Sequence, residues 1–488
     1  MEHESAEQTA PDEASETRRV LRLAADLAAE HLEHGERHRV SPAVAPGEVA
    51  AALAPSPPAR GEEWDAIFAD YRQTIEPNVT HWNHPGFLAY FATTASLPGV
   101  AAETLTAALN VNAMLWSTAP AATELEELAC DWLRQMLELP AVFRGHLNDT
   151  ASVSTLVALA AARQRARPEA RQLGLAGSAP MTVYCSDQAH SSVDKALITL
   201  GLGLDGVRRV PSDDDYRLDP TALAAAIDRD RAAGLEPIAV VATAGTTSST
   251  SIDPIRAVAE VCGERGLWLH VDAAYAGCAA ICPEIRRLLD GLEQADSIVL
   301  NPHKWLFVPL DCSVLLVRDI DALRAAFRLV PEYLESGRPE ATNLMDLGIA
   351  LGRRFRALKL WMVIRRFGVE GLQAEIRRHV ALAQELARWL AAEPGFEVAA
   401  PVPLSVVCVR AMPLGVERPG EEVDRFNLEL VVRVNRRGDV ALSHTRLRCG
   451  VVARLAIGNL RTERRHVRAA FEQLGAEATV LRAEWGWS

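Results

Sequence analysis

The sequence predicts an α/β protein with a largely parallel central sheet. Between residues 83 and 370, short apolar runs alternate with segments of helical periodicity. Continuous apolar runs are typical of strands buried on both faces, and strands that alternate with helices favour a parallel sheet covered on both sides. In such sheets, ligands bind beyond the carboxyl ends of the strands. We therefore expect the functional site along that edge of the sheet.

The elements of this region can be assigned in chain order. Strands are expected at the apolar runs 181–186, 206–210, 237–245, 267–274, 296–302 and 312–319. Helices are expected between them, at 190–200, 219–233, 253–265 and 283–292. No internal repeat is evident in the chain.

The two ends of the chain have other patterns. Residues 1–15 are polar and acidic and are expected to be disordered, and an amphipathic helix pattern begins at Ser15. A Pro-rich connection then leads to a second short helix near 62–74. A long helix over about 348–395 precedes a smaller α+β unit. Its strands are expected at 396–400, 404–411, 440–447 and 451–458, before a final helix from Glu463.

These patterns predict three parts. Residues 1–82 form an N-terminal tail and helical segment, residues 83–370 a large α/β domain, and residues 371–488 a small α+β domain. Two helices joined by a Pro-rich connector cannot form much of a core alone. The N-terminal segment is therefore expected to pack across a second subunit or onto the large domain.

The composition narrows the classes of function. The chain has 488 residues, of which 49% are hydrophobic and 24% charged, as in ordinary folded proteins. Its net charge of −13, without an extended basic cluster, makes nucleic acid and anionic membranes poor electrostatic partners. No apolar stretch reaches the roughly 18 residues that span a bilayer. Because the acidic N-terminus is unlike a secretory signal or a transit peptide, we expect a cytoplasmic protein.

The cysteines and lysines carry further information. The eight cysteines include no CxxC pair and mostly lie in apolar runs, which is typical of reduced core thiols rather than of a disulfide framework or a zinc site. No metal site is predicted. Of the 51 basic residues, only Lys195, Lys304 and Lys359 are lysines. Because lysine can lose its proton and act as a nucleophile, whereas arginine stays charged, a retained lysine is a candidate for chemistry.

Polar residues follow three of the predicted strands. One strand runs into Thr247, the next carries Asp272 near its end, and a third leads to His303 and Lys304. A carboxylate at the end of an apolar strand needs a cationic or hydrogen-bonding partner. A carboxylate and a lysine at one edge suit a ligand with a cationic nitrogen and a carbonyl carbon, and pyridoxal phosphate has both. On spacing alone, a structural ion pair between Asp272 and Lys304 explains the pattern equally well.

Two further features suit the same ligand. Residues 149–152 directly precede a helical pattern, and the Thr150 hydroxyl with free backbone N–H groups at a helix N-terminus would form an anion site. His190 follows a predicted strand, where an imidazole could lie over a planar ring. Taken alone, the first feature is more simply helix capping and the second a capping histidine. Their convergence with Asp272 and Lys304 favours pyridoxal phosphate.

Three longer motifs contain these residues, namely DQAHSS at 187–192, HVDAAYAG at 270–277 and NPHKWL at 301–306. They resemble the group II pyridoxal-phosphate decarboxylases, and most closely the aromatic L-amino acid decarboxylases. The similarity covers nearly the whole chain, from His81 to the segment 454–458. It implies the fold-type I (aspartate aminotransferase-like) fold of pyridoxal phosphate (PLP) enzymes. It also implies a homodimer with active sites at the interface, embraced by the N-terminal helices.

The resemblance implies a role for each matching residue. Lys304 would form the Schiff base with PLP, Asp272 would pair with the pyridine nitrogen, and His190 would stack on the ring. Further contacts would come from Ala274 at the ring, from Ala151, Ser152 and Asn301 at the phosphate, and from His303 and Thr247. Lys195 and Lys359 match no cofactor position and are expected on helix surfaces.

The resemblance also implies a substrate side. The residues that match the family's substrate wall are Trp82, Tyr90, Phe91 and Thr93. This wall favours a flat aromatic side chain, although such rings also suit an ordinary core. Gly352 matches a position where glycine leaves room for larger rings.

Two residues depart from the family pattern. Asp149 stands where many relatives have glycine beside the phosphate, and it is expected to turn away and cap the helix. Ala92 replaces a proline that is common in animal relatives, which leaves the fine shape of the substrate wall open.

The product is implied by one further residue. Tyr333 matches a tyrosine on a mobile loop that is placed to protonate Cα, and relatives with phenylalanine there tend toward oxidative deamination to the aldehyde. The predicted activity is therefore decarboxylation of an aromatic L-amino acid, of the tryptophan, DOPA or tyrosine type, to its amine and CO₂. The alternatives are an aromatic aldehyde synthase, a decarboxylase of a non-aromatic amino acid, and a cofactor-binding protein without turnover.

Overall fold

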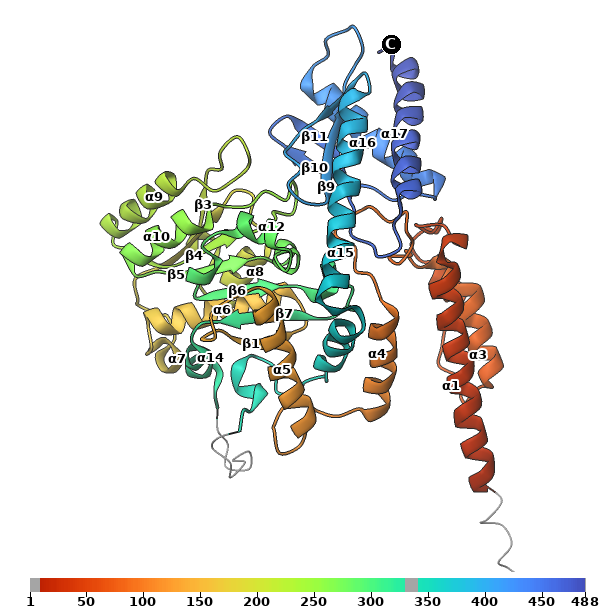
Figure 1. The fold of residues 1–488 in the computed structure, drawn as a ribbon, viewed down its shortest axis with the longest axis horizontal. Coiled ribbons are helices and arrows are strands. Elements are labelled where there is room, and N and C mark those ends of the chain that lie inside the picture. Colours follow the sequence, from red (N-terminus) through yellow and green to blue (C-terminus); the bar gives the residue numbers. More distant parts are fainter. Residues whose placement is uncertain (1–8, 330–340, 488) are drawn as a thin grey trace, which may run out of the picture.

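A seven-stranded sheet forms the centre of the computed structural model, which describes residues 9–329 and 341–487 (Figure 1). In spatial order the strands are β1 (Arg144–Asn148), β7 (Ser313–Val317), β6 (Ser297–Leu300), β5 (Trp268–Asp272), β4 (Glu236–Thr243), β2 (Met181–Ser186) and β3 (Val207–Val210). The pairs from β6 to β3 are parallel, whereas β7 runs antiparallel to both β6 and β1. The predicted, largely parallel sheet is confirmed, and all six strands predicted in this region are present.

Both faces of this sheet are buried because successive strand residues point to opposite sides. In β4, Val240 and Ala242 pack in one hydrophobic core, and Ala239 and Val241 pack in another. The first face is covered by α5 (Pro120–Met136), α9 (Pro220–Ala232) and α10 (Ile255–Arg265). The second is covered by α6 (Ala151–Ala166), α8 (Ser192–Thr199) and α14 (Ile320–Phe327). This double burial is the reason for the continuous apolar runs in the sequence.

Two elements of this region differ from the expectation. The sequence does not predict β1, because Arg144 and Gly145 at its start interrupt the apolar pattern and only its last three residues are buried. The helix expected at 283–292 is broken into α12 (Pro283–Arg286) and two 3₁₀ turns, η5 (Arg287–Leu289) and η6 (Leu292–Gln294). The break falls at Gly291, whose φ of 93° does not fit a helix. Further helices are α2 (Glu48–Ala51), α4 (Leu97–Leu109), α7 (Ala170–Leu173), α11 (Ala276–Ala279) and α13 (Pro302–Trp305).

A long helix connects this sheet to a smaller unit. The helix α15 (Ala357–Ala392) is interrupted at Gly368 (φ 65°, ψ 170°), and it begins later than the predicted residue 348. The smaller unit has a four-stranded antiparallel sheet in the order β10 (Ser443–Leu447), β11 (Gly450–Ala456), β9 (Val406–Ala411) and β8 (Phe396–Val398). Its four predicted strands are confirmed, and the helix α17 (Arg464–Trp485) begins after its N-cap, Glu463, as expected. A further helix, α16 (Gly420–Arg437), is not predicted.

The N-terminal segment projects from the rest of the chain (Figure 1). It contains α1 (Thr9–His34) and α3 (Trp64–Asp70), which lie side by side and are joined by a hydrogen bond of 3.0 Å from Trp64 Nε1 to Glu16. The expectation of disorder up to residue 15 is wrong for residues 9–15, which are helical. Proline and acidic residues suit the first turns of a helix, and the sequence has Pro11, Asp12 and Glu13 there. The division of the chain into domains at 82 and 370 stays a prediction.

Several smaller expectations can be compared with the structure. All eight cysteines are free and seven are buried, whereas Cys449 is exposed. Lys195 is exposed on α8 as expected. The expectation of a surface position is wrong for Lys359, which is 1% exposed and whose Nζ lies 2.5 Å from a Glu103 carboxylate oxygen. Among the helices of residues 9–329 and 341–487, none is long and apolar enough to cross a membrane.

Candidate active site

The ends of three strands bring the predicted cofactor residues together. In the register of the sheet, Thr243 of β4 lies opposite Asp272 of β5, and Asp272 lies opposite Val299 of β6. β6 ends at Leu300, and Lys304 follows on the short helix α13. The carboxylate and the lysine therefore lie at the carboxyl edge of the sheet, where parallel sheets bind ligands.

Burial and charged neighbours act on Lys304 in this setting. Asp272 is 6% exposed, and its Oδ1 accepts a hydrogen bond of 3.1 Å from the N–H of Ala274. Burial lowers the pKa of Lys304; the Asp272 carboxylate opposes this shift, and the Arg454 guanidinium adds to it. A lysine whose pKa is lowered gives up its proton more readily, as an amine nucleophile must.

Two imidazoles near Lys304 are held in their neutral form. Nδ1 of His190 accepts a hydrogen bond of 3.1 Å from the N–H of Ser192, so the neutral ring carries its hydrogen on Nε2. Desolvation lowers the pKa of His190, Asp272 opposes the shift, and Lys304 adds to it. Nδ1 of His303 likewise accepts a bond of 2.9 Å from the N–H of Cys312, and burial lowers the pKa of His303 to about 3. Both rings are therefore uncharged at neutral pH.

The N-terminus of α6 offers an anion site. Thr150 is its N-cap residue, and the first N–H groups of a helix, here those of Ala151 and Ser152, have no intrahelical acceptor. The side chain of Asp149 turns toward its own neighbour, because its Oδ1 accepts from the N–H of Thr150 at 2.6 Å and from the Thr150 hydroxyl at 3.2 Å. The expectation that Asp149 caps the helix is therefore wrong, since it binds the N-cap residue instead of the first turn.

The helix end lies at the same edge of the sheet as Lys304. Asn148, which ends β1, lies opposite Ser313, and the adjacent Cys312 binds His303. Asn301 is 2% exposed, and its Oδ1 has no hydrogen-bond partner within the described parts of the chain. A buried polar atom of this kind needs a partner, which a bound ligand can supply.

A cavity of about 840 Å³ opens above this edge. It is lined by Lys304, His190 and Thr247, by Trp82, Tyr90, Phe91 and Thr93 of the predicted substrate wall, and by Leu310, Ser443, His444, Thr445 and Arg454. Nζ of Lys304 lies 5.0 Å from the centroid of the Phe91 ring, on which Tyr275 stacks at 3.9 Å. The structure thus places the predicted wall beside the predicted nucleophile. Gly352, by contrast, is exposed, and a Cβ added there would meet no atom of the described residues within 4 Å.

Arg454 of β11 is a candidate that the sequence analysis does not identify. It is 3% exposed and donates to the carbonyl oxygens of Ser248 and Tyr90 at 3.1 and 2.6 Å, while its Nη2 has no partner among the described residues. A buried guanidinium with a spare donor suits a carboxylate ligand. Its signal in the sequence is an arginine within the apolar run 451–458, where only a strand was expected.

This arrangement fits PLP. It offers an amine for the aldehyde, a carboxylate for the ring nitrogen and a helix N-terminus for the phosphate, together with buried polar atoms that have no partner among residues 9–329 and 341–487. A model of the pyridoxal-dependent decarboxylase conserved domain matches residues 46–412. The chain belongs to this family of decarboxylases. It is a PLP-dependent amino acid decarboxylase with the fold-type I architecture that the sequence predicts.

Relatives of this decarboxylase match it along their whole length. It is 42% identical to the aromatic-L-amino-acid decarboxylase of Sus scrofa, over 97% of this chain and 98% of the relative. It is 39% identical to the phenylacetaldehyde synthase of Arabidopsis thaliana, over 99% of both chains. The crystal structure of Oryza sativa TDC with PLP and tryptamine is 39% identical and superimposes with a TM-score of 0.93, over 98% of this chain and 100% of that one.

One predicted catalytic residue cannot be placed. Tyr333 lies outside the described residues, which end at 329 and resume at 341. Its role, like the roles of the other residues assigned by resemblance, stays a prediction.

Proposed function

We propose that this decarboxylase converts an aromatic L-amino acid to the corresponding amine and CO₂. The observation that carries the proposal is the aromatic wall beside Lys304. Trp82 and Tyr90 line the cavity with their rings stacked at 5.9 Å, and Phe91 lies under the Lys304 amine. Flat rings of this kind favour a flat aromatic side chain.

Each polar residue of the site has a distinct task in this proposal. Bound PLP supplies the electron sink for the electrons of the bond to the carboxylate. Lys304 holds the cofactor, Asp272 keeps its ring nitrogen protonated, and neutral His190 covers the ring face without adding charge. Arg454 offers its spare Nη2 donor to the substrate carboxylate. Charged side chains that are buried, as those of Asp272 and Arg454 are, act more strongly than they would in bulk water.

The amine product is proposed over the aldehyde because of Tyr333. A phenol close to Cα can protonate it before oxygen reacts there. The second candidate function is aldehyde synthesis, which the similarity to the phenylacetaldehyde synthase of Arabidopsis thaliana favours. Replacing the phenol tests this point: the Tyr333→Phe variant is expected to release aldehyde, hydrogen peroxide and ammonia in place of part of the amine.

The same proposal includes a homodimer. On α4, the exposed fractions of Leu97, Leu105 and Leu109 are 71%, 51% and 59%. Leu21 of the projecting α1 is 58% exposed. Exposed apolar residues that gather on one element mark an interaction surface. Light scattering should give twice the chain mass of 53.0 kDa, and a mass of one chain at micromolar concentration would contradict the dimer.

Product analysis by mass spectrometry tests the activity. The PLP-loaded enzyme is incubated in air with tryptophan, DOPA, tyrosine, phenylalanine, histidine and glutamate in separate reactions. Amine from the aromatic substrates without hydrogen peroxide is the expected result. Aldehyde with peroxide would support the second function, and product from glutamate alone would contradict the aromatic assignment.

A further inference from the structure

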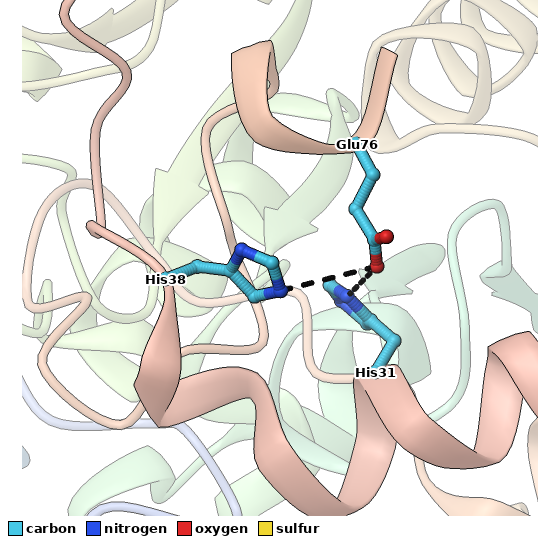
Figure 2. Close-up of side chains that lie close together, drawn as sticks. All are labelled: His31, His38 and Glu76. Carbon is cyan, nitrogen blue, oxygen red and sulfur yellow. Dashed lines mark hydrogen bonds and ion pairs between the residues drawn. The ribbon is translucent and has the colours of Figure 1, made fainter. Parts of the chain in front are cut away.

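Three side chains that commonly bind metals meet where the N-terminal helix joins the body of the chain (Figure 2). His31 lies in the last turn of α1, His38 follows the short helix η1 (Gly35–Arg37), and Glu76 begins the short helix η3 (Glu76–Asn78). Nδ1 of His31 lies 3.2 Å and Nε2 of His38 lies 4.0 Å from Oε1 of Glu76. One such atom from each residue lies within 4.8 Å of the other two.

We propose that His31, His38 and Glu76 bind one divalent transition-metal ion of the Zn²⁺ type. Imidazole nitrogens and a carboxylate oxygen are preferred zinc ligands, and bonds of about 2.0–2.2 Å in a tetrahedron place the ligand atoms about 3.3 Å apart. The spacing of 3.2 Å between His31 and Glu76 already has this value, so the main adjustment is an inward movement of the His38 ring. The three side chains are 15–32% exposed, which leaves a fourth position for water.

A third histidine supports the proposal. His81 is 3% exposed, and neither of its ring nitrogens has a hydrogen-bond partner in the described parts of the chain. Its ring stacks on that of His38 with 4.5 Å between centroids and lies 5.3 Å from that of His31. The His81 ring therefore packs against the rings of both histidines that are proposed as ligands.

The simpler alternative is an ion pair between His31 and Glu76. It explains the contact of 3.2 Å between these two residues. It gives no reason for His38 to approach the same carboxylate, or for the buried ring of His81 to stack on that of His38. The cysteine pattern predicts no metal site, and this cluster has no local signal in the sequence, since His31 and Glu76 are 45 positions apart.

The ion would reinforce a junction that reaches the active site. The N–H of His81 donates to the carbonyl of Val40 at 2.9 Å, and the N–H of Val40 donates to the carbonyl of Gly438 at 2.7 Å. Trp82, which lines the active-site cavity, directly follows His81. Metal binding at this cluster is therefore expected to stabilise the contact of α1 with the substrate wall and with the small C-terminal unit.

Isothermal titration of the full-length, PLP-loaded enzyme with ZnCl₂, after treatment with a chelator and its removal, tests the proposal. One Zn²⁺ per chain is expected, with affinity lowered tenfold or more in His31→Gln and in His38→Gln. His34→Gln is the matched control, because His34 is an exposed histidine one turn from His31 on the same helix. It should bind Zn²⁺ as the wild type does.

Thermal unfolding gives a second readout. Because a ligand of the folded state stabilises it, Zn²⁺ should raise the Tm of the wild type and of His34→Gln but not of His38→Gln. The Tm values without metal show whether a variant is folded. Glu76→Gln removes the negative charge of the carboxylate ligand and keeps the shape of the side chain. No saturable binding to the wild type, or equal affinity in the wild type, His31→Gln and His38→Gln, would overturn the proposal.

Discussion

The indole Nε1–H of Trp305 donates a hydrogen bond of 3.0 Å to Nδ1 of His379, and both side chains are buried. Trp305 adjoins Lys304, whereas His379 lies on α15. Since Nδ1 is the acceptor, Nε2 carries the hydrogen and donates at 3.0 Å to the carbonyl of Asn459. The Asn459 amide donates in turn to the carbonyl of Trp82 at 3.2 Å. One chain of hydrogen bonds therefore links the helix of Lys304 to the substrate wall.

Removing the ring of His379 should destabilise the fold. His379→Leu leaves the Trp305 N–H buried without its acceptor, at a cost of about 1–3 kcal/mol, whereas the Asn459 carbonyl keeps the bond of 3.0 Å from the N–H of Thr462. His379→Gln, which keeps an acceptor and a donor, should lose less. The free energy of unfolding in urea measures both, and an equal loss in the two variants would contradict a hydrogen-bonding role.

The strands of the large sheet could be predicted because they are buried on both faces. A strand such as β4 needs apolar residues on both faces along its buried middle, Ile238 to Ala242, and this run is visible without knowing its neighbours. The antiparallel edge strand β1 and the helix α16 lack such a run, so their existence depends on packing that the sequence pattern does not reveal. α16 is amphipathic, but its apolar positions are spaced among charged ones.

The residues of the candidate site could be predicted where a reactive or charged side chain directly follows an apolar strand. Asp272 and Lys304 stand out because a charged residue after an apolar strand needs a reason. Arg454 was missed because its partners, the carbonyls of Ser248 and Tyr90, come from distant segments. Lys359 was misplaced for the same reason, since Glu103 compensates its buried charge from another helix.

Acid should begin to destabilise the protein at pH values well above those at which carboxylates take up protons. Burial lowers the pKa of five histidines to about 3 or 4, namely His81, His146, His270, His303 and His379. Such a histidine stays neutral in the folded protein, whereas in the unfolded chain it binds a proton below about pH 6.5. Proton binding therefore favours the unfolded chain, and the stability present above pH 6.5 is lost as the pH falls toward 4.

This prediction has a measurable slope. Each such histidine adds up to about 1.4 kcal/mol per pH unit to the pH dependence of the free energy of unfolding below pH 6.5. Urea unfolding between pH 7.5 and 5 should show the decline, and His379→Gln should reduce the slope by about one proton. Equal slopes in His379→Gln and the wild type would contradict a neutral, buried His379.

The buried ion pair between Glu126 and Arg353 should stabilise the fold. Both Glu126 oxygens accept from Nη2 of Arg353, at 2.7 and 2.9 Å, and the two side chains are almost fully buried. Burial alone would raise the pKa of Glu126. The charge of Arg353 and the hydrogen bond with His146 outweigh this effect and lower the pKa to about 2. The stability that the ionised Glu126 contributes is therefore present above pH 4.5 and is lost as the pH falls toward 2.

Glu126→Gln leaves the Arg353 charge buried and uncompensated, and it should cost about 3–5 kcal/mol of stability at pH 7. Glu127→Gln, at the exposed neighbouring position on α5, is the control and should cost far less. The difference between the two variants should shrink when the free energy of unfolding is measured below pH 4.5. A constant difference down to the acid transition would contradict an ionised Glu126.

Arg454 should recognise the substrate through its carboxylate. Arg454→Met removes hydrogen bonds to a charged group that are worth about 1.5–3 kcal/mol, so kcat/KM for the best aromatic amino acid should fall about 10- to 150-fold. The amine product has no carboxylate, and its inhibition constant should change less than threefold. An equal loss for the amino acid and the amine would mean that Arg454 only supports the wall through Tyr90.

Lys304 should be the one lysine that binds the cofactor covalently. Reduction of the PLP-loaded enzyme with borohydride fixes a Schiff base as a stable amine, and peptide mass spectrometry then locates it among Lys195, Lys304 and Lys359. The label is expected on Lys304 alone, because its pKa is lowered by burial and it lines the cavity, whereas Lys195 is exposed and Lys359 is paired with Glu103. Lys304→Arg should abolish both the label and turnover, since a guanidinium stays charged and cannot attack the aldehyde. Lys195→Arg is the matched control and should keep both; a label on Lys195 or Lys359 in the wild type would contradict the assignment of Lys304.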